Sequence, residues 1–82
     1  MKLLIRNLNR KISEKKLHSL FAVHGVVKSC TLVIDSNTGS SKGFGFVEME
    51  SEIDGVKAIK ALNKKTIEGN QIRVKEVEED KS

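Results

Sequence analysis

Two phenylalanines and a lysine alternate along residues 42–49 (KGFGFVEM), and this combination of side chains can bind nucleic acid. Successive side chains of a β-strand point to opposite faces, so Lys42, Phe44 and Phe46 share one face of the predicted strand. The other face carries Gly43, Gly45, Val47 and Met49. Aromatic rings stack on unpaired bases and a cation binds phosphate, so the segment predicts a binding platform exposed to solvent. The alternative is a short glycine-rich strand that is buried or lies at the edge of a sheet.

Three further segments, 2–6, 26–34 and 71–77, are predicted strands that would flank this platform. The residues predicted to lie on the platform face are Leu4, Arg6, Thr31, Val33, Gln71, Arg73 and Lys75. The residues predicted to face the core are Leu3, Ile5, Cys30, Leu32, Ile72, Val74 and Val77. A loop rich in turn residues, 35–41, would join the second strand to the platform strand as a hairpin.

Two helices are predicted from N-cap residues followed by apolar residues at helical spacing. Ser13 begins a helix that reaches about Val23, and Ser51 begins a capping-box pattern and a helix that ends near Asn63. Gly55 inside the second helix costs about 1 kcal/mol relative to alanine, so we expect it where that helix touches the sheet. The order β-α-β-β-α-β predicts an α+β, ferredoxin-like sandwich, with a four-stranded antiparallel sheet and both helices on one face.

The composition allows one small core and no second one. Of 82 residues, 38% are hydrophobic, and no apolar run approaches the roughly 20 residues that span a bilayer. The first residues are too short for a signal peptide, so we expect a cytoplasmic protein with no membrane partner. The single cysteine, Cys30, permits no internal disulfide and agrees with a reducing, intracellular compartment. Its apolar surroundings predict a buried structural thiol.

The net charge of +4 is unevenly distributed. Residues 76–82 hold four acids and one lysine, a net charge of −3, which leaves +7 for residues 1–75. A basic body favours a polyanionic partner. We expect a domain over residues 1–77 and an acidic, disordered tail over residues 78–82.

The segment 42–49 matches the consensus Lys/Arg-Gly-Phe/Tyr-Gly/Ala-Phe-Val-x-Phe/Tyr at every position but the last, where Met49 replaces an aromatic residue. With 3–8 (LLIRNL), 35–42 and 58–63, it makes the chain resemble the RNA-recognition motif family over residues 2–77. Within that family the chain is similar to small stand-alone RNA-binding proteins of bacteria and organelles. Leu4 departs from the family pattern, which usually places an aromatic residue there.

The resemblance implies that the open sheet face binds single-stranded RNA, with bases stacked on two phenylalanines and phosphates bound by basic residues. The predicted RNA-binding residues are Leu4, Arg6, Lys42, Phe44, Phe46, Arg73 and Lys75. Single-stranded DNA is left open as a second ligand. The alternative is a variant of the same fold whose sheet or helices bind a protein or a second copy, although such variants tend to lose the intact segment 42–49. We expect a monomer.

No enzymatic activity is predicted. An acylphosphatase-like enzyme of this topology would have a glycine-rich anion loop with an arginine after the first strand, where this chain has residues 7–11 (NLNRK). A copper-chaperone-like domain would have paired cysteines there. A single cysteine and two scattered histidines predict no metal site, and no nucleophile and base pair is evident. We therefore expect no catalytic residue, no cofactor and no small-molecule substrate.

Overall fold

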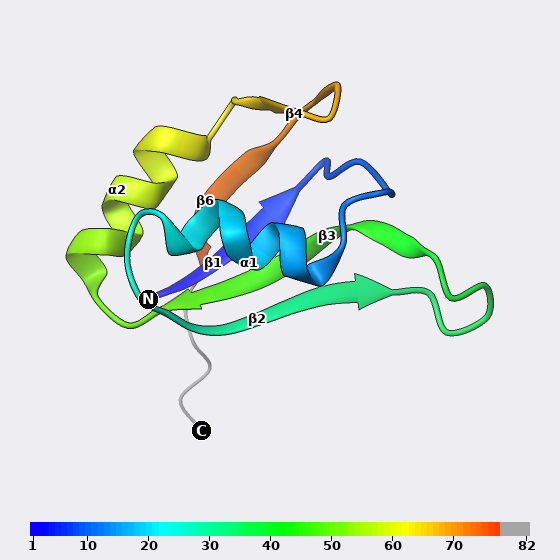
Figure 1. Ribbon diagram of the computed structural model, residues 1–82, viewed down its shortest axis with the longest axis horizontal. Coiled ribbons are helices and arrows are strands. Elements are labelled where there is room, and N and C mark those ends of the chain that lie inside the picture. Colours follow the sequence, from blue (N-terminus) through cyan, green and yellow to red (C-terminus); the bar gives the residue numbers. More distant parts are fainter. Residues whose placement is uncertain (78–82) are drawn as a thin grey trace.

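Two helices pack on one face of a four-stranded antiparallel sheet whose strand order is β2-β3-β1-β6 (Figure 1). The computed structural model describes residues 1–77, and the predicted acidic tail lies outside the described residues. The principal elements are β1 (Lys2–Arg6), α1 (Glu14–Ala22), β2 (Val27–Ile34), β3 (Ser41–Met49), α2 (Glu52–Leu62) and β6 (Arg73–Val77). The predicted β-α-β-β-α-β sandwich is confirmed. The two central strands, β1 and β3, carry most of the predicted platform.

Both helices begin at the predicted caps. The Ser13 hydroxyl accepts a hydrogen bond from the Lys16 amide at 3.1 Å, and the Ser51 hydroxyl accepts one from the Asp54 amide at 3.4 Å. Each bond satisfies one of the amides that the first turn of a helix leaves without a partner. The first helix ends at the C-cap Val23. Within residues 1–77, neither helix is long and apolar enough to cross a membrane.

The prediction of one continuous strand over residues 71–77 is wrong. Two short strands, β4 (Thr66–Ile67) and β5 (Asn70–Gln71), form a separate hairpin. Its turn has φ of 52° at Glu68 and 83° at Gly69, the left-handed values that a two-residue hairpin turn requires. Ile72 then separates this hairpin from β6, because its amide donates to the Lys65 carbonyl at 2.9 Å instead of to a strand.

The core lies between the helices and the sheet and follows the predicted alternation in the central strands. Its largest fully buried side chains are Phe21, Leu3, Ile5, Leu17, Met49, Ile72 and Val47. Val77 differs from prediction: it lies opposite Lys2 and two residues after Lys75, so it belongs to the open face. The thioether of Met49 fills core space where the family consensus has a ring.

The two glycines of the platform strand are needed for different structural reasons. A Cβ at Gly45 would lie 2.6 Å from the Thr31 carbonyl oxygen and 3.0 Å from a methyl of Leu17, so this glycine lets the backbone of β2 and the side of α1 come close. Gly43 has a φ of +82°, which an L side chain adopts at a cost, and a Cβ there would lie 3.2 Å from the Leu8 carbonyl oxygen. Gly43 therefore admits the loop after β1 and not a helix.

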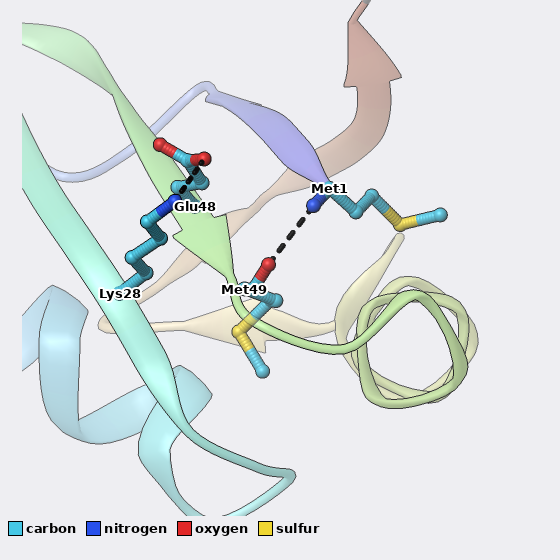
Figure 2. A network of polar contacts seen from close by, with 4 residues as sticks. All are labelled: Met1, Lys28, Glu48 and Met49. Carbon is cyan, nitrogen blue, oxygen red and sulfur yellow. Dashed lines mark hydrogen bonds and ion pairs between the residues drawn. The ribbon is translucent and has the colours of Figure 1, made fainter.

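Met1 joins β1 to the end of β3 (Figure 2). Its amino group donates to the Met49 carbonyl at 2.9 Å, and the Met49 amide donates to the Met1 carbonyl at 2.8 Å. The Met1 side chain occupies the place that a Cβ at Gly55 would need. The predicted close approach of the second helix to the sheet is thus a contact with the residue that precedes β1.

Candidate nucleic-acid interface

A row of four side chains crosses the sheet face opposite the helices. Phe46 of β3 lies opposite Thr31 of β2 on one side and Leu4 of β1 on the other, and Leu4 in turn lies opposite Lys75 of β6. Directly opposed residues of antiparallel strands hold their Cβ atoms about 5 Å apart, so these side chains are neighbours. Leu4 is half-buried whereas Leu3 and Ile5 have no exposed surface, which places Leu4 outward as predicted.

The two aromatic rings of the platform are half-buried and in contact. Their centroids are 6.4 Å apart and their planes are inclined by 83°, so the edge of one ring faces the other. This geometry does not form one flat surface. A base stacked on one ring would meet the second ring at an angle, so Phe44 and Phe46 can contact two different parts of a nucleotide chain.

The four predicted cations, Arg6, Lys42, Arg73 and Lys75, are all exposed. Arg6 lies directly opposite Arg73 on the paired strands β1 and β6. Like charges in opposed positions repel each other, and a bound anion relieves that repulsion. None of the four lies within 4.0 Å of a carboxylate of the described residues. Their charges therefore remain available to a polyanion.

The structure divides these cations between two hollows. The larger one has a volume of about 590 Å³ and lies where β1 ends and β3 begins. It is lined by Arg6, Asn7, Leu8, Asn9, Arg10, Lys42, Gly43, Phe44 and Asn70. A smaller one of about 310 Å³ is lined by Arg6, Asn63, Arg73, Val74 and Lys75. Arg6 borders both hollows and links the platform strand to the edge strand β6.

At the opposite end of the same face, three charged side chains interact with each other or with the platform. The Lys28 ammonium lies 3.7 Å from the Glu48 carboxylate (Figure 2), and the Lys2 ammonium lies 5.0 Å from the centroid of the Phe46 ring. The pairing register shifts between Val27 and Ser29, which makes Lys28 the extra residue of a bulge. The sheet thus turns Lys28 toward Glu48.

The sequence analysis did not identify several of these residues as part of the site. Lys2 and Glu48 could have been found, because each continues the two-residue alternation of Leu4 or Phe46 along its own strand. The polar residues that the loop after β1 and strand β5 contribute to the larger hollow had no such signal. These are Asn7, Asn9, Arg10 and Asn70.

Cys30 does not belong to the open face. It lies opposite the buried Val47 and packs half-buried against the core, with its thiol 3.7 Å from the Glu14 carbonyl oxygen. Burial, and secondarily the negative charge of Glu14, raise the pKa of the Cys30 thiol from 9.0 to about 11. The thiol therefore stays protonated at neutral pH, where it is a poor nucleophile.

The sequence of this chain resembles those of known proteins. Residues 3–73 match the profile of the family described as RNA recognition motif. The chain is 43% identical over 75 residues to the 28 kDa chloroplast ribonucleoprotein of Spinacia oleracea, covering 92% of this chain and 32% of the relative. It thus spans about a third of that ribonucleoprotein.

Two proteins of similar size also resemble the chain. A Nostoc protein named RbpB, which its name presents as RNA-binding, is 38% identical over 74 residues, covering 90% of this chain and 72% of the relative. The crystal structure of the RNA-binding protein PG1 superimposes with a TM-score of 0.94 at 39% identity. That superposition covers 100% of this chain and 99% of PG1.

Proposed function

This chain belongs to the RNA recognition motif family, and on that premise we propose that its open sheet face binds single-stranded RNA by base stacking and phosphate contacts. The resemblance noted for residues 42–49 is confirmed by the family match. The observation that carries the proposal is the row Thr31, Phe46, Leu4 and Lys75, in which a ring, an apolar floor and a cation without an ion pair among residues 1–77 lie side by side. The module binds and performs no chemical step.

In this proposal, one base stacks on Phe46 while Phe44 contacts the sugar or base of a neighbouring nucleotide. Leu4 provides apolar contact but no π face. Base stacking on an aromatic side chain is worth about 1 to 3 kcal/mol by alanine substitution, so a leucine at this position holds the affinity below that of a full aromatic platform. Thr31 extends the floor toward β2, and the half-buried Val33 lies two residues further along that strand.

Phosphates bind the cations that surround the rings. Lys42 and Arg6 flank Phe44 in the larger hollow, and Arg73 and Lys75 extend the cationic surface across β6. Each phosphate contact on a single strand contributes about −0.7 to the slope of log affinity against log salt concentration. Three engaged cations predict a slope near −2 on that scale.

A second candidate is binding of a protein through the helical side. The side chains of Ile53 and Val56 on α2 are 70% and 40% exposed, and they line a hollow of about 370 Å³ with Glu52 and Lys57. Exposed apolar side chains that gather in one place are typical of contact surfaces. This candidate uses the layer opposite the rings, so the two functions predict binding on different faces.

Titration of the ¹⁵N-labelled protein with a random pool of single-stranded RNA separates them. We expect the amide signals of β3, including those of Phe44 and Phe46, to shift, while those of Ile53 and Val56 stay in place. Shifts confined to α2, or none at all, would contradict the proposal. A pool of single-stranded DNA serves as the second arm, because any preference for RNA reports contacts to the 2′-hydroxyl.

A further inference from the structure

The walls of the larger hollow are joined by asparagine side chains. The Asn7 amide group donates to the Gln71 carbonyl at 2.8 Å, and the Asn70 amide group donates back to the Asn7 carbonyl at 3.3 Å. The Asn9 amide group donates to the Glu68 carbonyl at 2.9 Å. These three bonds connect the loop after β1 to the β4–β5 hairpin, a segment more than 50 residues further along the chain.

The side chain of Asn9 also holds the backbone around Arg10. The Asn9 side-chain oxygen accepts from the Lys11 amide at 2.8 Å, so one asparagine holds both the hairpin and the residue beyond Arg10. Asn7 has a φ of 59°, a left-handed value that asparagine tolerates better than most residues, and this turns the chain out of β1. Arg10 lines the hollow as a result, whereas its neighbour Lys11 does not.

The hollow suits a nucleotide by charge and by size. Three cations, Arg6, Arg10 and Lys42, line it together with the ring of Phe44, and no carboxylate is among its lining residues. None of the three cations lies within 4.0 Å of a carboxylate of residues 1–77, so none of them is held there in a direct ion pair. Its volume of about 590 Å³ lies within the usual range for small-molecule sites.

We propose that this hollow binds one nucleotide beyond the sheet, next to the nucleotide that contacts Phe44, with its phosphate among Arg6, Arg10 and Lys42. This inference rests on the proposed function and extends it, because it assigns a phosphate-binding role to Arg10 and a positioning role to Asn9. The RNA site thereby includes the loop after β1, and the β4–β5 hairpin acts as the support that holds this loop.

The test compares Arg10→Ala with Lys11→Ala. Both variants remove one positive charge from adjacent, exposed positions, but only Arg10 lines the hollow. With a fluorescently labelled single-stranded RNA at 0.1 M salt, loss of one phosphate contact predicts about fivefold weaker binding for Arg10→Ala and a salt slope less steep by about 0.7. We expect a change of less than about twofold for Lys11→Ala, since a charge without a contact acts only through screened attraction. Equal losses for the two variants would overturn the proposal.

RNA length provides the second measurement. We expect one added nucleotide at one end of a minimal RNA to tighten binding to the wild-type protein, and this gain should vanish in Arg10→Ala but persist in Lys11→Ala. A gain that persists in Arg10→Ala would place the added nucleotide elsewhere and refute the assignment.

Asn9→Ala tests the positioning role without removing a charge. We expect it to weaken RNA binding in the wild-type background and to add no further loss in the Arg10→Ala background, because both changes then remove the same contact. Additive losses would refute the positioning role. Thermal melting of every variant separates these effects from unfolding.

The two proposals fail in different ways. If the wild-type protein binds no single-stranded RNA, the proposed function itself is wrong. If the wild type binds and Phe44→Ala weakens binding, but Arg10→Ala and Lys11→Ala behave alike, only the additional nucleotide site is wrong.

Discussion

The two ends of the open face carry similar side chains in opposite electrostatic states. At one end, Lys28 is paired with Glu48 and Lys2 lies over the Phe46 ring. At the other end, Arg6 and Lys42 line a hollow without a carboxylate. Both ends are built from β1 and β3, because Lys2 and Arg6 are the two ends of β1. We therefore expect phosphate to bind where the cations have no ion pair among residues 1–77, and not simply where cations are most numerous.

The difference concerns binding more than stability. An exposed ion pair such as that of Lys28 and Glu48 contributes only about 0 to 1 kcal/mol to folding. Its main consequence is that the charge of Lys28 is already offset before any ligand arrives. The Arg6 and Lys42 end has no such compensation within the described residues, so phosphate contacts should concentrate there.

The largest expected effect comes from Phe44→Ala, which removes the ring that lines the larger hollow with Arg6 and Lys42. RNA affinity should fall by about 1 to 3 kcal/mol, while the melting temperature should change little because the ring packs on the solvent side of the sheet. Fluorescence anisotropy and thermal melting measure the two quantities. Phe21→Ala is the matched control: its ring is fully buried, so it should lose about 3 to 5 kcal/mol of stability. If Phe44→Ala melted like the control and still bound RNA normally, the ring would be structural.

Leu4→Phe should have the next largest effect, in the opposite direction. The added ring would stand between Phe46 and Lys75 on the open face, where a second stacking surface should tighten RNA binding by up to about 1 to 2 kcal/mol. Because Leu4 points outward, the larger side chain should avoid the cost of about 1 to 3 kcal/mol that overpacking a core incurs. Affinity and melting temperature are again measured together. A destabilised variant would refute the outward assignment, and a stable variant with unimproved affinity would refute stacking at this position.

These central positions are also the part of the molecule that sequence predicts best. Two-residue alternation assigns Leu4, Phe44 and Phe46 to one face, because the pleat of a strand forces it, and serine caps locate both helices. The hydrophobic side of each strand also excludes pairings that slip by one residue, since such a slip would turn the core face outward, but it does not exclude a slip of two residues.

What sequence could not predict depends on contacts between distant segments. The bulge that turns Lys28 toward Glu48 requires knowledge of the β2–β3 register. The hollow requires the hydrogen bonds of Asn7 and Asn9 to the β4–β5 hairpin, and Gln71 of that hairpin was predicted to belong to the longer strand 71–77. The sequence likewise gives no sign that the Leu8 carbonyl oxygen lies beside Gly43, whose φ is left-handed.

Comparing Lys42→Ala with Lys28→Ala tests the contrast between the two ends directly. Both residues are exposed lysines of the sheet, but among residues 1–77 Lys28 has an ion pair and Lys42 has none. Loss of one phosphate contact predicts about fivefold weaker binding at 0.1 M salt and a slope less steep by about 0.7 for Lys42→Ala. Lys28→Ala should change affinity by less than about twofold, since its charge is already offset by Glu48. Salt titrations measure the RNA affinity and the salt slope of both variants. A larger loss of affinity for Lys28→Ala than for Lys42→Ala would contradict the proposed difference between the two ends.

Glu48→Gln should have the smallest effect. It removes the carboxylate that pairs with Lys28, so this end of the face would resemble the end that carries Arg6 and Lys42. Glutamine keeps the size of the side chain but cannot form the ion pair, so Lys28 is released and the open face gains one unit of positive charge. The expected gain in RNA affinity is about twofold at low salt, consistent with the modest energy of exposed ion pairs. It should fade in 1 M salt, where charges are screened beyond about 3 Å. Stability should remain within about 1 kcal/mol of the wild type. The double variant Glu48→Gln with Lys28→Ala is the control, and it should lose part of the gain because the released cation is gone. A weaker affinity of Glu48→Gln for RNA would mean that the carboxylate itself contacts the ligand, for example by accepting a hydrogen bond from a base, and the paired end would then take part in recognition.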